Sequence, residues 1–521
     1  MANADYFVVG CPMNRSKALS FLPVLLLAAF SVSSCSGPNS TLACFGGNCT
    51  VVGGGTATVS LTLVADTLPP NPSILSFKVS IGSIALTPAS GTAQTFTPTS
   101  PIVVDLMRLQ SDTVFLGTLT KVPSGSYTVQ VSLSSPEITF LNDTSSTITA
   151  NGVACLINAV CTASFTAVGT PTVSSFTFNA TSSGQQGIEL DFNLKNAISL
   201  SSGTLSVNFN PSSPNPGVFT AFTLPRTNAN LGASQLELIE DFTGVVTVSG
   251  STVTITSRTR GTLAATVTSN SFFDQSPAPT NLCPSAPNNC AAAGQIASVD
   301  AFLKSDGTLE LKEFEPLNAT QQDFVEGTVY AVNGLTQFSI NVTDRVQAAS
   351  NSLIGGLNTG DLLTVNIPAP QPFFVDSKGL AVPAGSIGLF QGQTDTSAIH
   401  PGQTVAVHVT TFTAATTTTI AIATADTVTL RWSRLTATPV TSTTQLLNVN
   451  ALPSYFNFTS SIQFVVQLFA GTQGAQGVTN FDGLADGSGI VIKPVSVRAL
   501  FFENPGDTAS PAFFAAKVRQ H

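Results

Sequence analysis

The chain has 521 residues, of which 43% are hydrophobic and only 9% are charged, with a formal net charge of −9. Soluble domains ordinarily carry about 25% charged residues, so Ser, Thr, Asn, Gln and Gly must fill most solvent-facing positions. An acidic chain without a basic cluster argues against nucleic acid and anionic lipid headgroups as partners. Thr and Ser alternate with Val, Ile, Leu and Phe along most of the chain, which is the pattern of β-strands. The length allows about three or four domains.

The first 35 residues have the layout of a secretion signal. Arg15 and Lys17 precede an apolar run over residues 18–32, and V-S-S-C follows at residues 32–35. A run of about 15 apolar residues is short for a membrane span and suits a cleavable signal. The V-S-S-C step resembles a bacterial lipobox, which implies cleavage before Cys35 and a lipid on that cysteine. The alternative is an ordinary secretion signal in which Cys35 has no role.

The residues around the lipobox also indicate a location. Ser36 stands where lipoproteins retained at the inner membrane commonly carry Asp, so the resemblance favours the outer membrane or the cell surface. We therefore expect the protein to meet the membrane through the lipid on Cys35. Residues 36–51 are rich in Gly, Ser and Asn and are expected to form a tether. Met13, just ahead of the basic pair, is an alternative start to Met1.

Six further cysteines of the mature chain fall into three close pairs: Cys44 with Cys49, Cys155 with Cys161, and Cys283 with Cys290. In an oxidising compartment such pairs predict local disulfides, each contributing about 2 kcal/mol. The alternative is metal binding, but no pair has the two-residue spacing of a zinc knuckle and no histidine lies near. We expect three disulfides, and neither a metal ion nor another cofactor.

Residues 52–215 show short alternating strands separated by turn signals, at the spacing of a β-sandwich. I-V-V-D-L-M at 102–107, V-P-S-G-S-Y-T-V at 122–129 and G-I-E-L-D-F at 187–192 occur in that order. These three motifs resemble a bacterial lipoprotein domain family of unknown function. The resemblance implies one β-sandwich domain and supplies no catalytic residues. A Pro, Ser and Asn-rich stretch at 211–216 is expected to end this domain.

A repeat follows. Residues 241–248 and 252–256 form an expected hairpin with its turn at Ser249-Gly250, and residues 324–332 and 338–342 form another at Asn333-Gly334. A third unit has no clear opening and ends in residues 495–502 and 513–518. The recurrence resembles a second uncharacterised bacterial family of small β-barrels, loosely similar to the oligomer-binding (OB) fold. We expect barrels over residues 230–318, 320–436 and 440–521, and an all-β fold in which an N-terminal β-sandwich precedes about three OB-like modules.

Few residues suit a metal or a nucleophilic site. His400 and His408 are eight residues apart, about 26 Å along an extended strand, which is too far to share a metal ion; the other histidine is His521. No G-x-S-x-G motif accompanies them. The loop D-G-L-A-D-G-S-G at 482–489 lacks the spacing and the closing Glu of a calcium loop. We expect all of these residues to be structural.

Paired carboxylates are the remaining catalytic option, because a glycosidase requires two of them. Glu189 and Asp191 alternate on one expected strand, about 7 Å apart. A second group precedes the first expected barrel: Glu237, Glu240 and Asp241. Sugar cleavage generally comes with stacking aromatics, whereas the single Trp432 stands alone. We expect these carboxylates to lie on solvated strand faces.

We therefore expect a non-enzymatic, lipid-anchored protein outside the cytoplasm, which presents loops to an envelope protein or polysaccharide. Its negative charge argues against nucleic acid as a partner. The alternative is a surface carbohydrate-binding or hydrolytic protein that uses the paired carboxylates. A cleft that joins two carboxylates to stacked aromatics would favour this alternative.

Overall fold

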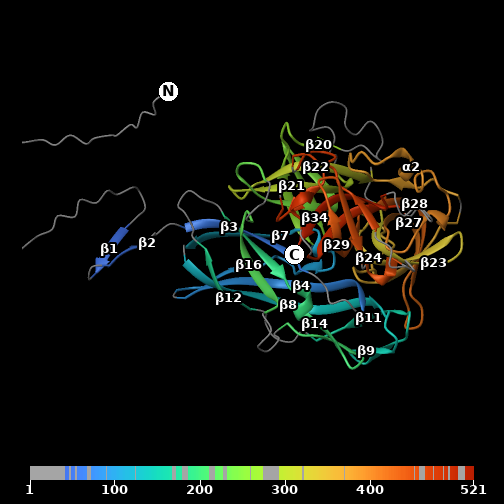
Figure 1. Ribbon diagram of the computed structural model, residues 1–521, viewed down its shortest axis with the longest axis horizontal. Helices are drawn as coiled ribbons and strands as arrows, with labels where there is room; N and C mark the ends of the chain where they lie inside the picture. The colour runs from blue at the N-terminus through green and yellow to red at the C-terminus, as the bar shows by residue number, and fades with distance from the viewer. Residues whose placement is uncertain are drawn as a thin grey trace, which may run out of the picture. The chain divides into compact units, whose positions relative to one another are not determined.

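The structure is a computed structural model. It describes residues 41–45, 48–52, 56–66, 72–89, 91–123, 125–166, 172–178, 186–209, 217–226, 231–258, 260–273, 293–318, 322–368, 370–450, 452–456, 464–472, 474–484, 486–490, 493–502 and 511–521. Most of these residues lie in strands, which confirms the expected all-β class (Figure 1). The α-helices found in these ranges are α1 (Leu194–Ala197) and α2 (Ala384–Ile387). In this part of the chain, no helix is long and apolar enough to cross a membrane.

The chain divides into two compact units, residues 1–52 and 53–521. In the first, the structure describes an antiparallel hairpin of β1 (Thr41–Phe45) and β2 (Asn48–Val52), in which Cys44 lies opposite Cys49. The stretch expected to be a tether thus contains paired strands. Cys35 and the expected signal sequence lie outside the described residues.

The second unit begins with the sandwich, which contains three sheets. One has the strand order β11-β8-β4-β5, with β6 also on β4 and β12 also on β8. Another has the order β16-β13-β3-β7, in which β13 runs parallel to β3, and a small third sheet has the order β10-β9-β15-β14. The bounds are β3 (Thr56–Ala65), β4 (Ser73–Pro88), β5 (Gln94–Phe96), β6 (Ile102–Asp105), η1 (Arg108–Gln110), β7 (Val114–Pro123), β8 (Gly125–Leu141), β9 (Ile148–Ala150), β10 (Val153–Cys155), β11 (Val160–Ser164), β12 (Thr172–Phe178), β13 (Gln186–Phe192), β14 (Ile198–Ser201), β15 (Thr204–Val207) and β16 (Phe219–Leu224).

One apolar core holds the sandwich together. It collects alternate side chains from all three sheets, among them Leu61 of β3, Phe77 of β4 and Leu205 of β15, each at most 1% exposed. Phe192 packs edge-on against Phe77, with the ring centres 6.1 Å apart. The alternation seen in the sequence therefore marks the buried face of each strand, as the period of two requires.

Three sheets of one topology follow. Their strand orders are β19-β18-β17-β21-β22-β20, β25-β24-β23-β27-β28-β26 and β31-β30-β29-β33-β34-β32. The bounds are β17 (Gln235–Ser249), β18 (Thr252–Ser257), β19 (Gly261–Thr266), β20 (Phe272–Phe273), β21 (Ile296–Lys304), β22 (Leu309–Asn318); β23 (Phe324–Val332), β24 (Gln337–Val346), β25 (Leu362–Asn366), β26 (Phe374–Val375), η3 (Thr396–Ala398), β27 (Thr404–Thr413), β28 (Ala421–Arg431); β29 (Ser433–Ser442), β30 (Leu446–Asn450), η4 (Ser454–Phe456), β31 (Phe464–Gln467), β32 (Asn480–Asp482), η5 (Gly487–Gly489), β33 (Val495–Phe501) and β34 (Phe513–Gln520).

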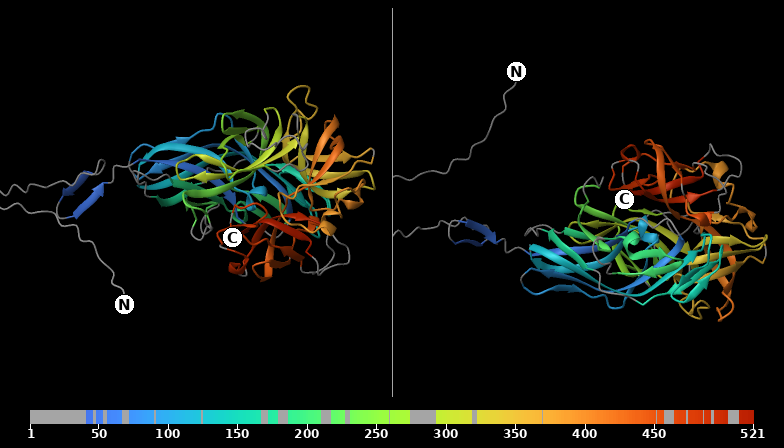
Figure 2. Two further views of the ribbon diagram at one scale, coloured as in Figure 1. Left: turned by 90° about the horizontal axis from the view of Figure 1, so that it is seen from above. Right: turned by 60° about the horizontal axis from the view of Figure 1, so that its bottom comes forward.

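In each of these sheets, the third strand in sequence also pairs in parallel with the last one, so that five strands return on themselves. The five strands of each barrel are numbered here in chain order, leaving out the short strands β20, β26 and β32. The cyclic order is then 1-2-3-5-4-1, with strands 3 and 5 parallel, which is the order of the OB fold. The expectation of OB-like modules is confirmed at this level. We call the modules barrels 1, 2 and 3 (Figure 2, green to red).

Two module boundaries differ from those expected. β16 pairs with β13 along its whole length, so the sandwich extends past residues 211–216 to Leu224. Barrel 3 opens with β29 at Ser433, inside the range expected for barrel 2. β29 pairs with the neighbouring β30 and also with β33, about sixty residues on, and the second pairing is the one that assigns it to barrel 3.

Candidate functional site

The few charged side chains are concentrated inside the molecule. About half of them are buried in the described part of the chain, among them Glu189, Glu237, Glu240 and Asp241. The expectation that these carboxylates lie on solvated strand faces is therefore wrong. Their strands have two buried faces, one against a barrel or sandwich core and one against a neighbouring module.

The three barrels carry different charges at equivalent positions. The fourth strands of the barrels, β21, β27 and β33, can be aligned by their pairing, which places Val299, Val405 and Val497 at equivalent positions. Next to each valine and to the residues paired with it lie three sites, on the first, fourth and fifth strands. Their side chains are buried or nearly buried and point away from the barrel core. Barrel 1 has Asp241, Asp300 and Glu315 there; barrel 2 has Glu326, Ala406 and Arg431; barrel 3 has Arg434, Arg498 and Arg519. Barrel 1 thus presents acids where barrel 3 presents bases.

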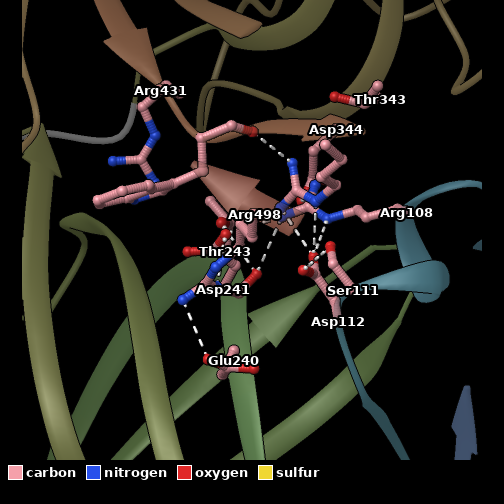
Figure 3. Close-up of polar contacts among 12 residues, drawn as sticks. Arg108, Ser111, Asp112, Glu240, Asp241, Thr243, Thr343, Asp344, Arg431 and Arg498 are labelled. Carbon is pink, nitrogen blue, oxygen red and sulfur yellow. Dashed lines mark hydrogen bonds and ion pairs between the residues drawn. The ribbon is translucent and has the colours of Figure 1, made fainter. Parts of the chain in front are cut away.

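These sites and the sandwich loop around η1 meet in what we call the central charge cluster. Its members are Arg108, Asp112, Glu240, Asp241, Arg260, Asp300, Glu315, Glu326, Asp344, Asp376, Lys378, Arg431, Arg434, Arg498 and Lys517. Figure 3 shows Arg108, Arg431 and Arg498 reaching this cluster from different elements. Because each barrel and the sandwich contribute, the cluster joins all four modules.

Asp241 lies at the middle of this cluster because of a local irregularity in β17. The pairing of β17 with β21 shifts register between Ile239 and Phe242, and Asp241 has a φ of 50°. A bulge of this kind re-aims a side chain. The Asp241 carboxylate lies 2.9 Å from Lys378 Nζ, 2.9 Å from Arg434 Nη2 and 3.1 Å from Arg498 Nη1. Burial alone would raise the pKa of Asp241, but Arg498, Lys378 and Arg434 hold it well below its ordinary value.

The sandwich enters the cluster through the loop after β6. Arg108, only 5% exposed, contacts Asp112 at 3.1 Å, Glu326 of barrel 2 at 3.3 Å and Asp344 of barrel 2 at 3.4 Å. In return, Arg434 of barrel 3 donates from both Nε and Nη2 to Asp112 Oδ2, at 2.9 and 2.7 Å. The I-V-V-D-L-M motif, whose Ile102, Val104, Leu106 and Met107 lie in the sandwich core, leads into this loop.

An arginine of barrel 3 also binds the backbone of the loop after β6. Arg519 donates to the carbonyl oxygens of Leu109, Gln110 and Asp112 at 2.8, 3.1 and 3.2 Å. Its Nε also binds Asp482 Oδ2 at 2.6 Å. Asp482, the last residue of β32, therefore orients an arginine.

Three cations join barrel 2 to barrel 1. Arg431 lies against Glu315 of barrel 1 and Asp376 of barrel 2, and 3.3 Å from Glu326. Lys378 bridges Asp241 and Asp300 of barrel 1, at 2.9 and 3.4 Å. Arg260 of barrel 1 reaches back to Asp344 at 2.8 Å. Charges of opposite sign thus face each other at each of these contacts.

The described residues of the central charge cluster enclose a small void. A void beside Arg108, Arg260 and Asp344 holds about 20 Å³, which is the size of one water molecule. Perturbed carboxyl groups often mark active sites. Here burial raises the pKa of Glu237 and of Glu313 to about 7, but both side chains are shut off from solvent. The ion pairs of this cluster therefore tie the modules to one another.

The histidines occupy three unrelated places. His408 Nδ1 lies 2.7 Å from Asp426 on the surface of barrel 2. His521 is buried between Ser496, 2.7 Å from Nε2, and Asp66, 3.2 Å from Nδ1. His400 lies at the edge of a cleft described below. Among the described residues, no group of three or more His, Cys, Asp or Glu side chains could hold a metal ion.

The other candidate residues are core residues. Glu189 is fully buried with Arg226 Nη1 3.1 Å away, and Asp191 is partly buried on the same strand. Trp432 is 1% exposed and belongs to the core of barrel 2, so it offers no stacking surface. The carboxylate pairs and the tryptophan are thus not brought together.

The expected disulfide between Cys155 and Cys161 is present, with the Cα atoms 5.9 Å apart. It closes the turn between β10 and β11. Cys283 and Cys290 lie outside the described residues.

A larger opening lies where the sandwich, barrel 2 and barrel 3 meet. We call it the junction cleft; its volume is about 730 Å³. Its lining comprises Leu141, Asp143 and Asn158 of the sandwich, Tyr330, Ala331, Val332, Ile399, His400 and Pro401 of barrel 2, and Ser454 and Tyr455 of barrel 3. Asp143 is the one carboxylate in this lining, and the lining contains neither Lys nor Arg.

No protein-family model, curated protein or solved structure matches this chain. The candidate site therefore depends on geometry alone.

Of the cleft residues, the sequence singled out only His400. A usable signal was the scarcity of tyrosine: the chain has four Tyr against 35 Phe. A tyrosine carries a polar group that favours a partly wet position. Two of the four, Tyr330 and Tyr455, line the junction cleft.

Proposed function

We propose that this protein is a lipid-anchored, non-enzymatic binding component of the bacterial cell envelope. The observation that carries the non-enzymatic role is the placement of charge: of the carboxylates that the sequence offered as catalytic candidates, Glu189, Glu237, Glu240 and Asp241 are buried, and the void beside the central charge cluster holds about 20 Å³. Groups that never meet a reactant cannot serve as acid, base or nucleophile.

The binding role is supported by the junction cleft. Its volume falls in the range of small-molecule sites, about 300–1,000 Å³. Hydrolysis of a glycoside would need two carboxyl groups about 5–10 Å apart on a shared substrate. The lining offers Asp143 alone. Binding without cleavage is therefore favoured over the hydrolytic alternative.

The anchor rests on the sequence, in which V-S-S-C follows a short apolar run with a basic start. Acyl chains on Cys35 would hold the mature protein on a membrane, since each buried methylene contributes about 0.8 kcal/mol. The resemblance of the N-terminal motifs to a lipoprotein domain family points the same way, and Ser36 favours the outer membrane.

The experiment is a fractionation of cells that express the wild-type chain or Cys35→Ala. We expect the wild type in the membrane fraction, and the variant in the soluble fraction of the periplasm or medium. Ser34→Ala is a matched control that leaves the cysteine in place. A Cys35→Ala protein that stays on membranes would contradict the anchor.

A further inference from the structure

The junction cleft has the composition of a site for an uncharged, hydroxyl-rich ligand. Asp143, Asn158, His400 and Ser454 supply hydrogen-bonding groups, and the half-buried Tyr330 supplies aromatic surface. Without Lys or Arg in the lining, nothing there compensates an anionic ligand, and the Asp143 carboxylate repels one. A wholly apolar ligand would leave the polar groups without water or partners.

One group in this lining lacks a partner. Asp143 Oδ2 accepts hydrogen bonds from Ser73 Oγ and Ser454 Oγ, both at 2.7 Å. Asp143 Oδ1 is buried and has no hydrogen-bond partner among the described residues. An unpaired buried acceptor is costly, so a hydroxyl donor placed beside it is stabilised.

The cleft is held in shape from three sides. Ser73, Asp143 and Ser454 tie the sandwich to barrel 3, and Ser454 N also donates to Ser73 Oγ at 3.1 Å. Asn158 lies in the turn bridged by the disulfide, and its backbone N donates to Asn142 O at 2.7 Å.

On the barrel 2 side, Gly402 follows Pro401 with a φ of 92°. A Cβ atom at this glycine would lie 2.2 Å from the Phe456 ring, so only glycine lets barrel 3 approach this closely. A preformed site loses less entropy on binding, which raises affinity.

We propose that the junction cleft binds a neutral oligosaccharide, with its hydroxyl groups on Asp143 and Asn158 and a sugar ring against Tyr330. Sugars combine hydroxyl donors and acceptors with C–H faces, and this lining combines acceptors and amides with aromatic rings. The inference rests on the proposed binding role and adds to it the class of ligand.

The test uses the full chain carrying Cys35→Ala, purified from an oxidising compartment, and calorimetric titration with cellotriose, maltotriose, tri-N-acetylchitotriose and, as an acidic comparison, trigalacturonate. We expect a Kd below about 1 mM for at least one neutral trisaccharide and at least tenfold weaker binding of trigalacturonate. Failure of all three neutral sugars to bind at about 10 mM, or an equal affinity for trigalacturonate, overturns the inference.

Variants locate the site. Tyr330→Ala and Asp143→Asn should each weaken binding about tenfold or more, and Tyr330→Phe, which keeps the ring, less than about threefold. Asp426→Asn, which removes an exposed carboxylate beside His408, is the matched control and should leave the Kd unchanged. Thermal unfolding of each variant verifies its fold. Unchanged affinity in a folded Tyr330→Ala or Asp143→Asn variant overturns the location.

Product analysis separates the two proposals. Binding with an intact trisaccharide supports both of them. Cleavage of the bound sugar would contradict the non-enzymatic role and leave the ligand class standing, whereas failure to bind overturns the ligand class and leaves the Cys35 fractionation as the test of the anchor.

Discussion

Asp241 shows how much of the assembly depends on one side chain. A bulge turns it out of the ladder of β17, and three cations from barrels 2 and 3 converge on it. Buried ion pairs add little net stability when intact, because desolvation offsets their attraction. Removing one partner is different, since the charges left behind stay buried without compensation.

We therefore predict that Asp241→Ala lowers the free energy of unfolding by about 3–5 kcal/mol. The variant leaves Lys378, Arg434 and Arg498 with an excess of buried positive charge. Chemical denaturation of the purified chain measures the effect.

The control is Asp426→Ala, which removes a carboxylate whose side chain is 48% exposed beside His408. A surface pair contributes at most about 1 kcal/mol. If both variants lose the same small amount, the cluster does not hold the modules together.

The buried carboxyl groups also make stability depend on pH. Burial raises the pKa of Glu237 and Glu313 to about 7, so the folded state binds their protons more tightly than the unfolded chain. Their contribution is full below about pH 4.5 and is lost as the pH rises toward 7. Asp241 and Asp300 have lowered pKa values, because cations outweigh the opposing effect of burial, and their contribution is lost in stronger acid.

We accordingly predict a maximum of stability near pH 4–5 and a fall in melting temperature between pH 5 and 7. Glu237→Gln, which mimics the protonated form, should reduce this fall, because one pKa unit corresponds to about 1.4 kcal/mol. Calorimetric scans from pH 3 to 8 measure it. An unchanged slope in Glu237→Gln would show that this carboxyl group does not titrate as inferred.

At the scale of elements, the hairpins were predictable and the long-range pairings were not. Gly250 and Gly334 both have positive φ at the turns expected from Ser249-Gly250 and Asn333-Gly334. Such turns depend on neighbouring residues only. The pairing of β13 with β3 joins positions well over a hundred residues apart, and no local pattern encodes it.

The candidate site was hidden for a related reason. The repeat was visible, but the opening of barrel 3 was not, so Asp241, Glu326 and Arg434 could not be recognised as equivalent positions. Aligning three complete repeats would have exposed acids against bases. The junction cleft lies between modules, and only their packing creates it.

The disulfide of the β10–β11 turn gives a prediction at this scale. Replacing Cys155 and Cys161 together by Ala removes the constraint on a loop of about seven residues, which is worth about 2 kcal/mol. The free energy of unfolding should fall by that amount, with all other modules intact. Because Asn158 lies in this loop, affinity for the cleft ligand should fall as well. A stable variant with unchanged affinity would show that the loop holds its shape unaided.

At the scale of the whole molecule, three barrels of one topology must find their places beside each other. Their cores are alike, and apolar contacts alone would discriminate weakly between neighbours. Acids on barrel 1 and arginines on barrel 3 penalise a wrong arrangement, since like charges would be buried together.

This view predicts which fragments fold. Residues 53–226 contain the complete sandwich core, including β16, and should unfold cooperatively on their own. A fragment that ends at residue 213 lacks β16, exposes the edge of β13, and should be less stable by several kcal/mol or fail to fold. Thermal unfolding followed by circular dichroism compares the two. Equal stability would show that β16 adds nothing to the stability of the sandwich.

The long reach of these contacts matters most while the chain folds. Arg519 binds the carbonyl oxygen of Leu109, 410 residues earlier. Until the last strand of barrel 3 is in place, the face of the sandwich that awaits it is open to solvent. An apolar face would invite aggregation for all of that time, whereas one built around Arg108 and Asp112 remains hydrated. Burying charge between the modules therefore keeps the unfinished protein soluble until its last partner arrives.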